Sequence, residues 1–239
     1  TLYPSCNKSI SIMQIEKSTL DFLKSLKRNN NREWFQNNKD RYLEAQSNII
    51  SWVDALIQKM STHDDLQTEN GKESLYRIYN DVRFFKDKTP YNPRFAGYLK
   101  RSKPQLRGGY YFWIVPGATH IGCGFAYPNP DDLKRLRQDI ASNYHVWKKL
   151  LTKKSITSVF GAMQGDQVKT APKGYPQDHP AITLLRYKQF WFERAFTDAD
   201  VLSPRFVNEV NHSYRAIRPL FDHMSEVLTT NENGESILR

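Results

Sequence analysis

Apolar residues recur at helical spacing near both ends of the chain. Leu20, Leu23 and Leu26 predict a first amphipathic helix. Residues 31–60 carry a longer stripe of the same period, and residues 204–228 carry another. We therefore expect helices at both termini, each with one apolar face to bury.

The middle of the chain has the shorter period of β-strands. Residues 94–99, 109–115 and 120–127 predict three strands joined by short turns that contain Gly or Pro, an antiparallel meander. Further strands are expected at 75–85 and 189–196. The prediction is a single α+β domain, with a mainly antiparallel sheet of about five strands and helices from both termini packed on it.

The predicted domain spans residues 15–228. Residues 1–14 have no periodic apolar face, so we expect an extension that is disordered or foreign to the natural protein, with Met13 as an alternative native start that residues 1–12 precede. Residues 229–239 form a polar tail, for which we expect fraying. Residues 155–170 are mixed in composition, and we expect them to be partly extended.

Two glycines, Gly122 and Gly124, interrupt the third strand of the meander. They remove side chains from one face, which suggests close approach by a backbone, an aromatic ring or a ligand. A bulge or tight packing is the structural alternative. No third glycine or helix start follows at the spacing of a dinucleotide-binding loop.

The chain of 239 residues is basic, with 35 Lys and Arg against 25 Asp and Glu and a formal net charge of +10. This balance favours an anionic partner such as a phosphate ester, nucleic acid or an anionic membrane surface. Solvated surface charge without such a partner is the plainer alternative. Composition leaves both open.

Other residue types exclude several classes of protein. Cys6 and Cys123 are too isolated for a disulfide framework or a structural zinc site. The histidines are scattered, so we expect no metal and no cofactor. No apolar run approaches the roughly 20 residues of a membrane span, and no leader peptide is visible. We expect a cytoplasmic protein that does not insert into a membrane.

Charge is concentrated in one stretch. Between residues 77 and 101, seven Lys or Arg stand against two Asp, a difference of 7 − 2 = 5 that is half of the chain's excess. The densest part runs from Leu75 to Tyr91, where apolar residues alternate with Arg77, Asp81, Arg83, Lys86, Asp87 and Lys88.

This segment resembles a bacterial family known as domain of unknown function 2461, through its signature R-x-x-R-D-x-R-F-x-x-D-K-x-x-Y. Asn80 stands where the signature has Arg, so this position lacks a guanidinium group that could bind an anion through two hydrogen bonds. Residues 30–35, 172–175 and 179–188 are similar to other conserved parts of the family. The resemblance implies a site at the motif and names no reaction.

The candidate site follows from these segments. The expected ligand-binding residues are Arg77, Arg83, Lys86, Lys88, Arg186 and Lys188, and the candidates for acid–base chemistry are Asp81, Asp87, Tyr91 and His179. Asp81 either orients an arginine as a buried partner or belongs to a structural ion-pair cluster. His179, after a Pro-rich loop, can also be a surface or capping residue.

Two functions remain open. One is an enzyme or receptor for a small phosphorylated or carboxylated metabolite, bound in a basic pocket. The other is a nucleic-acid-binding module, in which Tyr110, Tyr111 and Trp113 provide a stacking surface. The chain has no HExxH, no Walker loop, no nucleophile elbow and no paired carboxylates, so it does not identify an enzyme.

Overall fold

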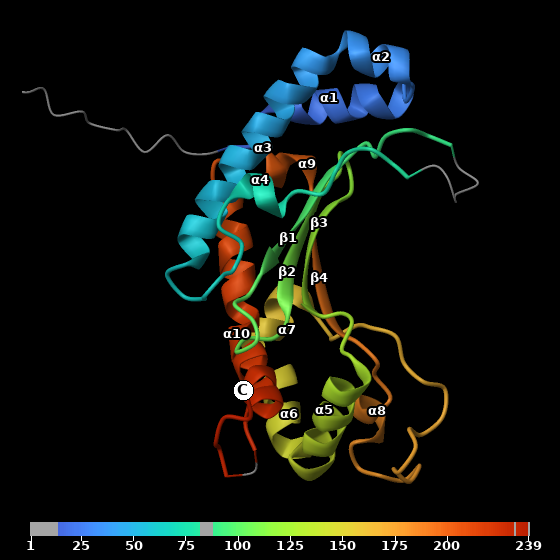
Figure 1. Ribbon diagram of the computed structural model, residues 1–239, viewed down its shortest axis with the longest axis vertical. Coiled ribbons are helices and arrows are strands. Elements are labelled where there is room, and N and C mark those ends of the chain that lie inside the picture. The colour runs from blue at the N-terminus through green and yellow to red at the C-terminus, as the bar shows by residue number, and fades with distance from the viewer. Residues whose placement is uncertain (1–13, 82–87, 232, 239) are drawn as a thin grey trace, which may run out of the picture.

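The computed structural model describes residues 14–81, 88–231 and 233–238 (Figure 1). Four strands form one antiparallel sheet in the order β1-β2-β3-β4. Their bounds are β1 (Phe95–Lys100), β2 (Gly109–Ile114), β3 (Thr119–Phe125) and β4 (Phe190–Phe196). The predicted α+β class and antiparallel meander are confirmed.

Helices precede, interrupt and follow the strands. Their bounds are α1 (Lys17–Arg28), α2 (Arg32–Asn37), α3 (Lys39–Met60), α4 (Gly71–Ser74), α5 (Pro130–Ser142), α6 (Tyr144–Leu151), α7 (Lys154–Phe160), α8 (Ile182–Leu185), α9 (Asp198–Val201) and α10 (Phe206–Thr229). The two long helices, α3 and α10, lie against each other and against the sheet (Figure 1).

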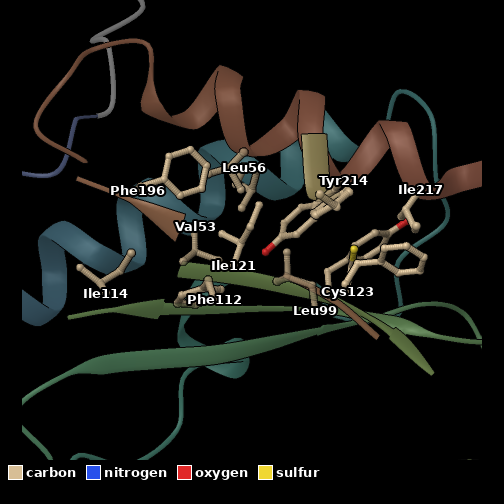
Figure 2. Packing of buried hydrophobic residues seen from close by; sticks show 14 of the residues in the cluster. Val53, Leu56, Leu99, Phe112, Ile114, Ile121, Cys123, Phe196, Tyr214 and Ile217 are labelled. Carbon is tan, nitrogen blue, oxygen red and sulfur yellow. The ribbon is translucent and has the colours of Figure 1, made fainter. Parts of the chain in front are cut away.

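The core lies between the sheet and these long helices. Figure 2 shows side chains of α3 and α10, including Val53, Leu56 and Tyr214, directed toward strand residues such as Phe112 and Ile121. All five are 0% exposed. Full burial of such a side chain stabilises the fold by roughly 1.5–3 kcal/mol, so this layer fixes how the sheet sits on the helices.

The predicted fifth strand is wrong in the part of the motif that the structure describes. Residues 75–81 make only isolated bridges, between Leu75 and Gly97 and between Tyr79 and Tyr91. Backbone hydrogen bonds from the Asn80 amide to the Pro90 carbonyl at 2.9 Å and from the Asn92 amide to the Ile78 carbonyl at 2.7 Å form the second bridge, and the Asn80 side-chain amide also donates to the Thr89 carbonyl at 2.9 Å. The segment therefore runs beside β1 without extending the sheet by a full strand.

Some helix boundaries differ from the sequence prediction. Asn31 caps α2 by accepting a hydrogen bond from the Trp34 amide, and at Asn38 the expected long helix breaks into α2 and α3. Residues 154–160 form α7, whereas Gln164 and Gln167 make isolated bridges, so the expected extended structure is absent from the first part of the 155–170 stretch and present in the second. In α7 the apolar residues Ile156 and Phe160 lie four apart and are buried, as one helical face requires.

Both ends of the predicted domain are tied to the fold. Ile15 is fully buried, and Asn48 donates its side-chain amide to the Gln14 carbonyl at 2.9 Å. At the other end, Thr230 pairs with Ser236, so the described part of the tail folds back on itself. None of the helices in residues 14–238, gaps apart, has the length and apolar composition of a membrane crossing.

A buried ion pair joins the helices to the sheet. The Arg101 guanidinium and the Asp64 carboxylate are both 0% exposed, and Arg101 Nε lies 2.9 Å from Asp64 Oδ2. Arg218 of α10 forms an ion pair with Asp64, with Nη1 3.1 Å from Oδ1, and the Tyr110 hydroxyl donates to Asp64 Oδ2. Arg101 further donates to the Arg107 carbonyl at 2.7 Å. Such a pair stabilises only when its remaining donors are satisfied, as they are here.

Candidate functional site

The second face of the sheet carries no helix in the described part of the chain (Figure 1). Because side chains alternate along a strand, every second residue of β1 to β4 points to this side. We call it the open face. Its larger side chains, each half-buried or exposed, are Tyr98, Lys100, Tyr111, Trp113, His120, Trp191 and Glu193.

Glycines on the open face make room for aromatic rings. A Cβ at Gly122 would lie 2.2 Å from the Trp191 ring, and one at Gly109 would lie 2.2 Å from the Tyr98 ring. Gly124 instead faces the Phe190 carbonyl, at 2.1 Å from a Cβ position. The expectation of close approach at 122 and 124 is confirmed, by a ring in one case and a backbone in the other.

The rings form an ordered array. Tyr98 stacks on Tyr111 with centroids 4.3 Å apart, and Trp113 stacks on His120 at 4.6 Å. Tyr111 and Trp113 are parallel within 12°. Trp191 crosses this array, inclined by 59° to Tyr111 and by 70° to Trp113. Contacts of this kind stabilise the observed arrangement of the rings.

The tyrosines of the open face remain neutral donors over a wide range of pH. Burial raises the pKa of Tyr111 above its usual range, and the neighbouring hydroxyls of Tyr98 and Tyr76 raise it further. Burial likewise raises the pKa of Tyr98. The one acid among the strand residues on this face is Glu193, whose carboxylate accepts from the Trp191 indole N–H at 2.7 Å.

The first half of the motif lies at one edge of this face. Tyr76 donates its backbone amide to the Ala96 carbonyl of β1 at 2.8 Å, and its ring is 52% exposed. Arg77 follows it and is exposed. Asp81 and Lys88 are also exposed, so Asp81 is not the buried partner that one interpretation expected. Arg83, Lys86 and Asp87 lie outside the described residues.

Tyr91 lies in the core and away from the surface. It is 6% exposed, and its ring stacks on Phe35 with centroids 4.0 Å apart. Burial is the main cause that raises the pKa of Tyr91. Its position favours a packing role over the acid–base role considered from the sequence.

The second candidate region lies at the opposite edge. Residues Gln164 and Gln167 bridge to Trp191 and Tyr187, which places Arg186 and Lys188 just before β4. Lys188 lies 3.8 Å from Asp166, both largely exposed. The Arg186 Nε is buried and has no hydrogen-bond partner among the described residues.

His179 is a local turn residue. Its Nδ1 accepts a hydrogen bond from the Ala181 amide at 3.0 Å, at the start of α8. This is the capping alternative that the sequence left open.

Three of the predicted cations that the structure describes, Arg77, Arg186 and Lys188, therefore flank the open face and do not meet in one pocket. Arg77 lies beside β1 and Arg186 beside β4, the two edge strands of the sheet. Three strand spacings of about 4.8 Å separate these edges, roughly 14 Å. A ligand that touches both must span the sheet.

Of the three aromatic residues proposed for stacking, Tyr111 and Trp113 lie on the open face, but Tyr110 does not. Tyr110 is 0% exposed and its hydroxyl bonds Asp64, so its expected surface role is wrong. Sequence reasoning missed Tyr98, His120 and Trp191. Their signal is alternation: each falls on the same side as Tyr111 once the strands are paired.

No group of three or more metal-binding side chains occurs within the ranges that the structure describes. The candidate site on the open face consists of aromatic rings with cations at its edges.

Comparisons with known proteins give one match. A family model described as "Conserved hypothetical protein (DUF2461)" matches residues 18–223. This range runs from α1 into α10 and contains the whole sheet, with both flanking segments. No curated protein and no solved structure matches the chain.

Proposed function

We propose that this chain, which belongs to the DUF2461 family of conserved hypothetical proteins, binds single-stranded nucleic acid on the open face of its sheet. The observation that carries the proposal is the array of Tyr98, Tyr111, Trp113 and Trp191 on a face without a helix among the described residues. Bases stack on aromatic side chains at a gain of about 1–3 kcal/mol each, with little dependence on sequence.

The distribution of charge supports an extended ligand. The width of the sheet separates Arg77 at one edge from Arg186 and Lys188 at the other. These cations therefore suit two phosphates that lie apart along one nucleic-acid chain. Lys100 adds a cation on the open face itself. A net charge of +10 adds long-range attraction for a polyanion.

Glu193 supplies selectivity in this proposal. Its carboxylate oxygen Oε1 accepts a hydrogen bond from the Trp191 indole N–H at 2.7 Å, so it lies beside the aromatic rings. A carboxylate repels phosphate but accepts hydrogen bonds from base amino groups. We expect it to face bases, with the phosphates directed toward the edges. An antiparallel four-stranded sheet with stacking aromatics is also how RNA-recognition motifs bind RNA, which is an analogy of architecture alone.

A second candidate is the small phosphorylated or carboxylated metabolite. One observation favours it: the Arg186 Nε is buried without a partner in the described structure, and a buried unpaired donor is costly. An anion that accepted from this N–H would remove the cost. The candidate is weaker because Arg77 lies at the far edge of the sheet.

Fluorescence anisotropy with labelled single-stranded RNA and DNA tests the proposal. Affinity should fall with salt, with a slope of about 0.7 in log affinity per unit of log salt for each phosphate contacted. Trp113→Leu should weaken binding roughly 5- to 150-fold, which corresponds to one lost stacking contact. Tyr144→Leu on α6, beyond the end of the sheet, is the matched control and should change nothing.

The same samples decide between the two candidates. If the open face binds single-stranded nucleic acid, inorganic phosphate and phosphorylated metabolites should leave the melting temperature of the protein unchanged. A metabolite at 100 times its dissociation constant would instead stabilise the protein by about 2.7 kcal/mol. Absence of oligonucleotide binding at micromolar protein and physiological salt, or equal binding by Trp113→Leu, refutes the nucleic-acid proposal.

A further inference from the structure

Residues of α5 and α10 line a cleft of about 720 Å³. Its volume lies in the range of small-molecule sites. The two helices run antiparallel there, because Arg135 contacts the end of α10 whereas Asp139, one turn later, meets the earlier residue His223. The residues that matter are Arg135, Gln138, Asp139, His223 and Glu226.

The imidazole of His223 is held in one orientation. Its Nε2 lies 3.2 Å from Asp139 Oδ2, and the edge of its ring meets Trp147 with centroids 5.1 Å apart. Asp139 is fixed in turn, since the Trp147 indole donates to Oδ2 at 2.6 Å and Asn143 donates to Oδ1 at 2.7 Å. Both carboxylate oxygens are therefore engaged within the protein.

This arrangement selects one tautomer of the neutral imidazole. Burial alone would raise the pKa of Asp139, but hydrogen bonds from His223, Asn143 and Trp147 lower it below its usual value. An ionised Asp139 accepts a proton donor at Nε2, so the lone pair of neutral His223 is at Nδ1. Because Asp139 engages Nε2, Nδ1 is the ring nitrogen of His223 that remains for a ligand in the cleft that this residue lines.

The charge of the cleft is opposite to that of the protein. Glu226 lies three residues after His223 on the same helix, and Asp139 is ionised. The single cation, Arg135, already donates to the carbonyls of Val227 at 2.9 Å and Thr230 at 2.6 Å, where it stabilises the end of α10. With His223 neutral, the charged lining residues sum to 1 − 2 = −1, in a chain of net charge +10.

We propose that this cleft is a binding site for an aliphatic amine, which donates N–H bonds to His223 Nδ1 and to the Glu226 carboxylate. Asp139 is a positioning residue, because it acts on the ligand through His223. A protonated amine suits an acceptor next to a carboxylate, whereas phosphate and carboxylate ligands would be repelled. A sugar fits less well, because Trp147 is 0% exposed and offers no ring for stacking.

The test compares two probes of equal length, putrescine and 1,4-butanediol, on the full chain. Imidazole resonances and titration calorimetry report binding. Putrescine should bind saturably and shift the Nδ1 resonance of His223, and the diol should do neither. Hydrogen bonds that involve a charged group are worth about 1.5–3 kcal/mol, so His223→Asn and Glu226→Gln should each weaken putrescine binding roughly 10- to 150-fold.

Matched controls separate the site from general charge effects. His212→Asn, at an exposed position of the same helix, and Glu33→Gln, at an exposed position of α2, should bind putrescine as the parent does. Asp139→Asn should alter the tautomer of His223, read from its ring nitrogen shifts, and weaken binding with it.

Two results overturn the proposal: equal binding of the diol, or equal affinity of the His223→Asn and His212→Asn proteins. The Nδ1 shift in the parent protein keeps the test valid if a variant does not fold. If the resonance stays in place during a putrescine titration, the proposal is refuted. None of these outcomes depends on whether the open face binds nucleic acid.

Discussion

The buried ion pair of Asp64 and Arg101 makes a strong prediction about stability. Asp64→Asn removes the only fully buried counter-ion that the described residues give Arg101, whose side chain is 0% exposed. Breaking a buried pair from one side costs about 3–5 kcal/mol, because the remaining charge stays buried. We expect about 3 kcal/mol, since Asp222, 3.0 Å from Arg101 Nη2 and half-exposed, remains as a partner.

Guanidinium chloride unfolding at neutral pH measures this cost. The dependence of the free energy of unfolding on denaturant concentration should keep its slope, while the free energy itself falls by about 3 kcal/mol. The melting temperature should fall by roughly 6–12 °C for a chain of this size. Asp222→Asn is the control, because its side chain is 51% exposed and it should cost under about 1 kcal/mol. Equal midpoints for the two variants would refute the reasoning.

Three further predictions concern other parts of the molecule. In Gly122→Ala the new methyl group should displace the half-exposed ring of Trp191, which shifts the tryptophan emission and weakens oligonucleotide binding. Because this ring can move aside, the free energy of unfolding should fall by less than about 1 kcal/mol. The lowered pKa of Asp139 contributes stability that is present above about pH 4 and is lost as the pH falls through the folded-state value, so Asp139→Asn should flatten the acid limb of an unfolding curve. Tyr91→Phe should leave the melting temperature unchanged within about 2 °C, whereas Tyr91→Ala loses the stack on Phe35 and about 3–5 kcal/mol, as differential scanning calorimetry would show.

Periodicity predicted much of the fold because each element has a strong local signal. The meander over 94–127 alternates apolar residues between short turns, and the observed strands overlap the predicted ranges, with β1 and β3 each extending one residue beyond them. Residues 75–85 carry a similar alternation, yet the described part makes only single bridges. Alternation shows that a segment suits a strand, whereas pairing depends on partners elsewhere in the chain.

The candidate site was harder to predict because its members meet only through pairing. Tyr110 and Tyr111 are adjacent and chemically identical, so composition cannot tell which of them faces the core. The answer lies in Asp64, a residue 46 positions earlier that needs the Tyr110 hydroxyl. Likewise, the sequence indicated a buried ion pair at Asp81, whereas long-range packing buries Arg101 with Asp64.

The buried ion pair and the aromatic rings of the open face lie on opposite faces of the same sheet. Asp64 bonds Arg101, directly after β1, and Tyr110 in β2, and so fixes the register in which Leu99 faces Tyr110. That register sets Tyr98 opposite Tyr111 on the other side, because side chains alternate. A slip of one residue would turn the rings into the core. An Asp64→Asn protein that still folds should therefore bind oligonucleotides more weakly, although Asp64 is 0% exposed and contacts no ligand.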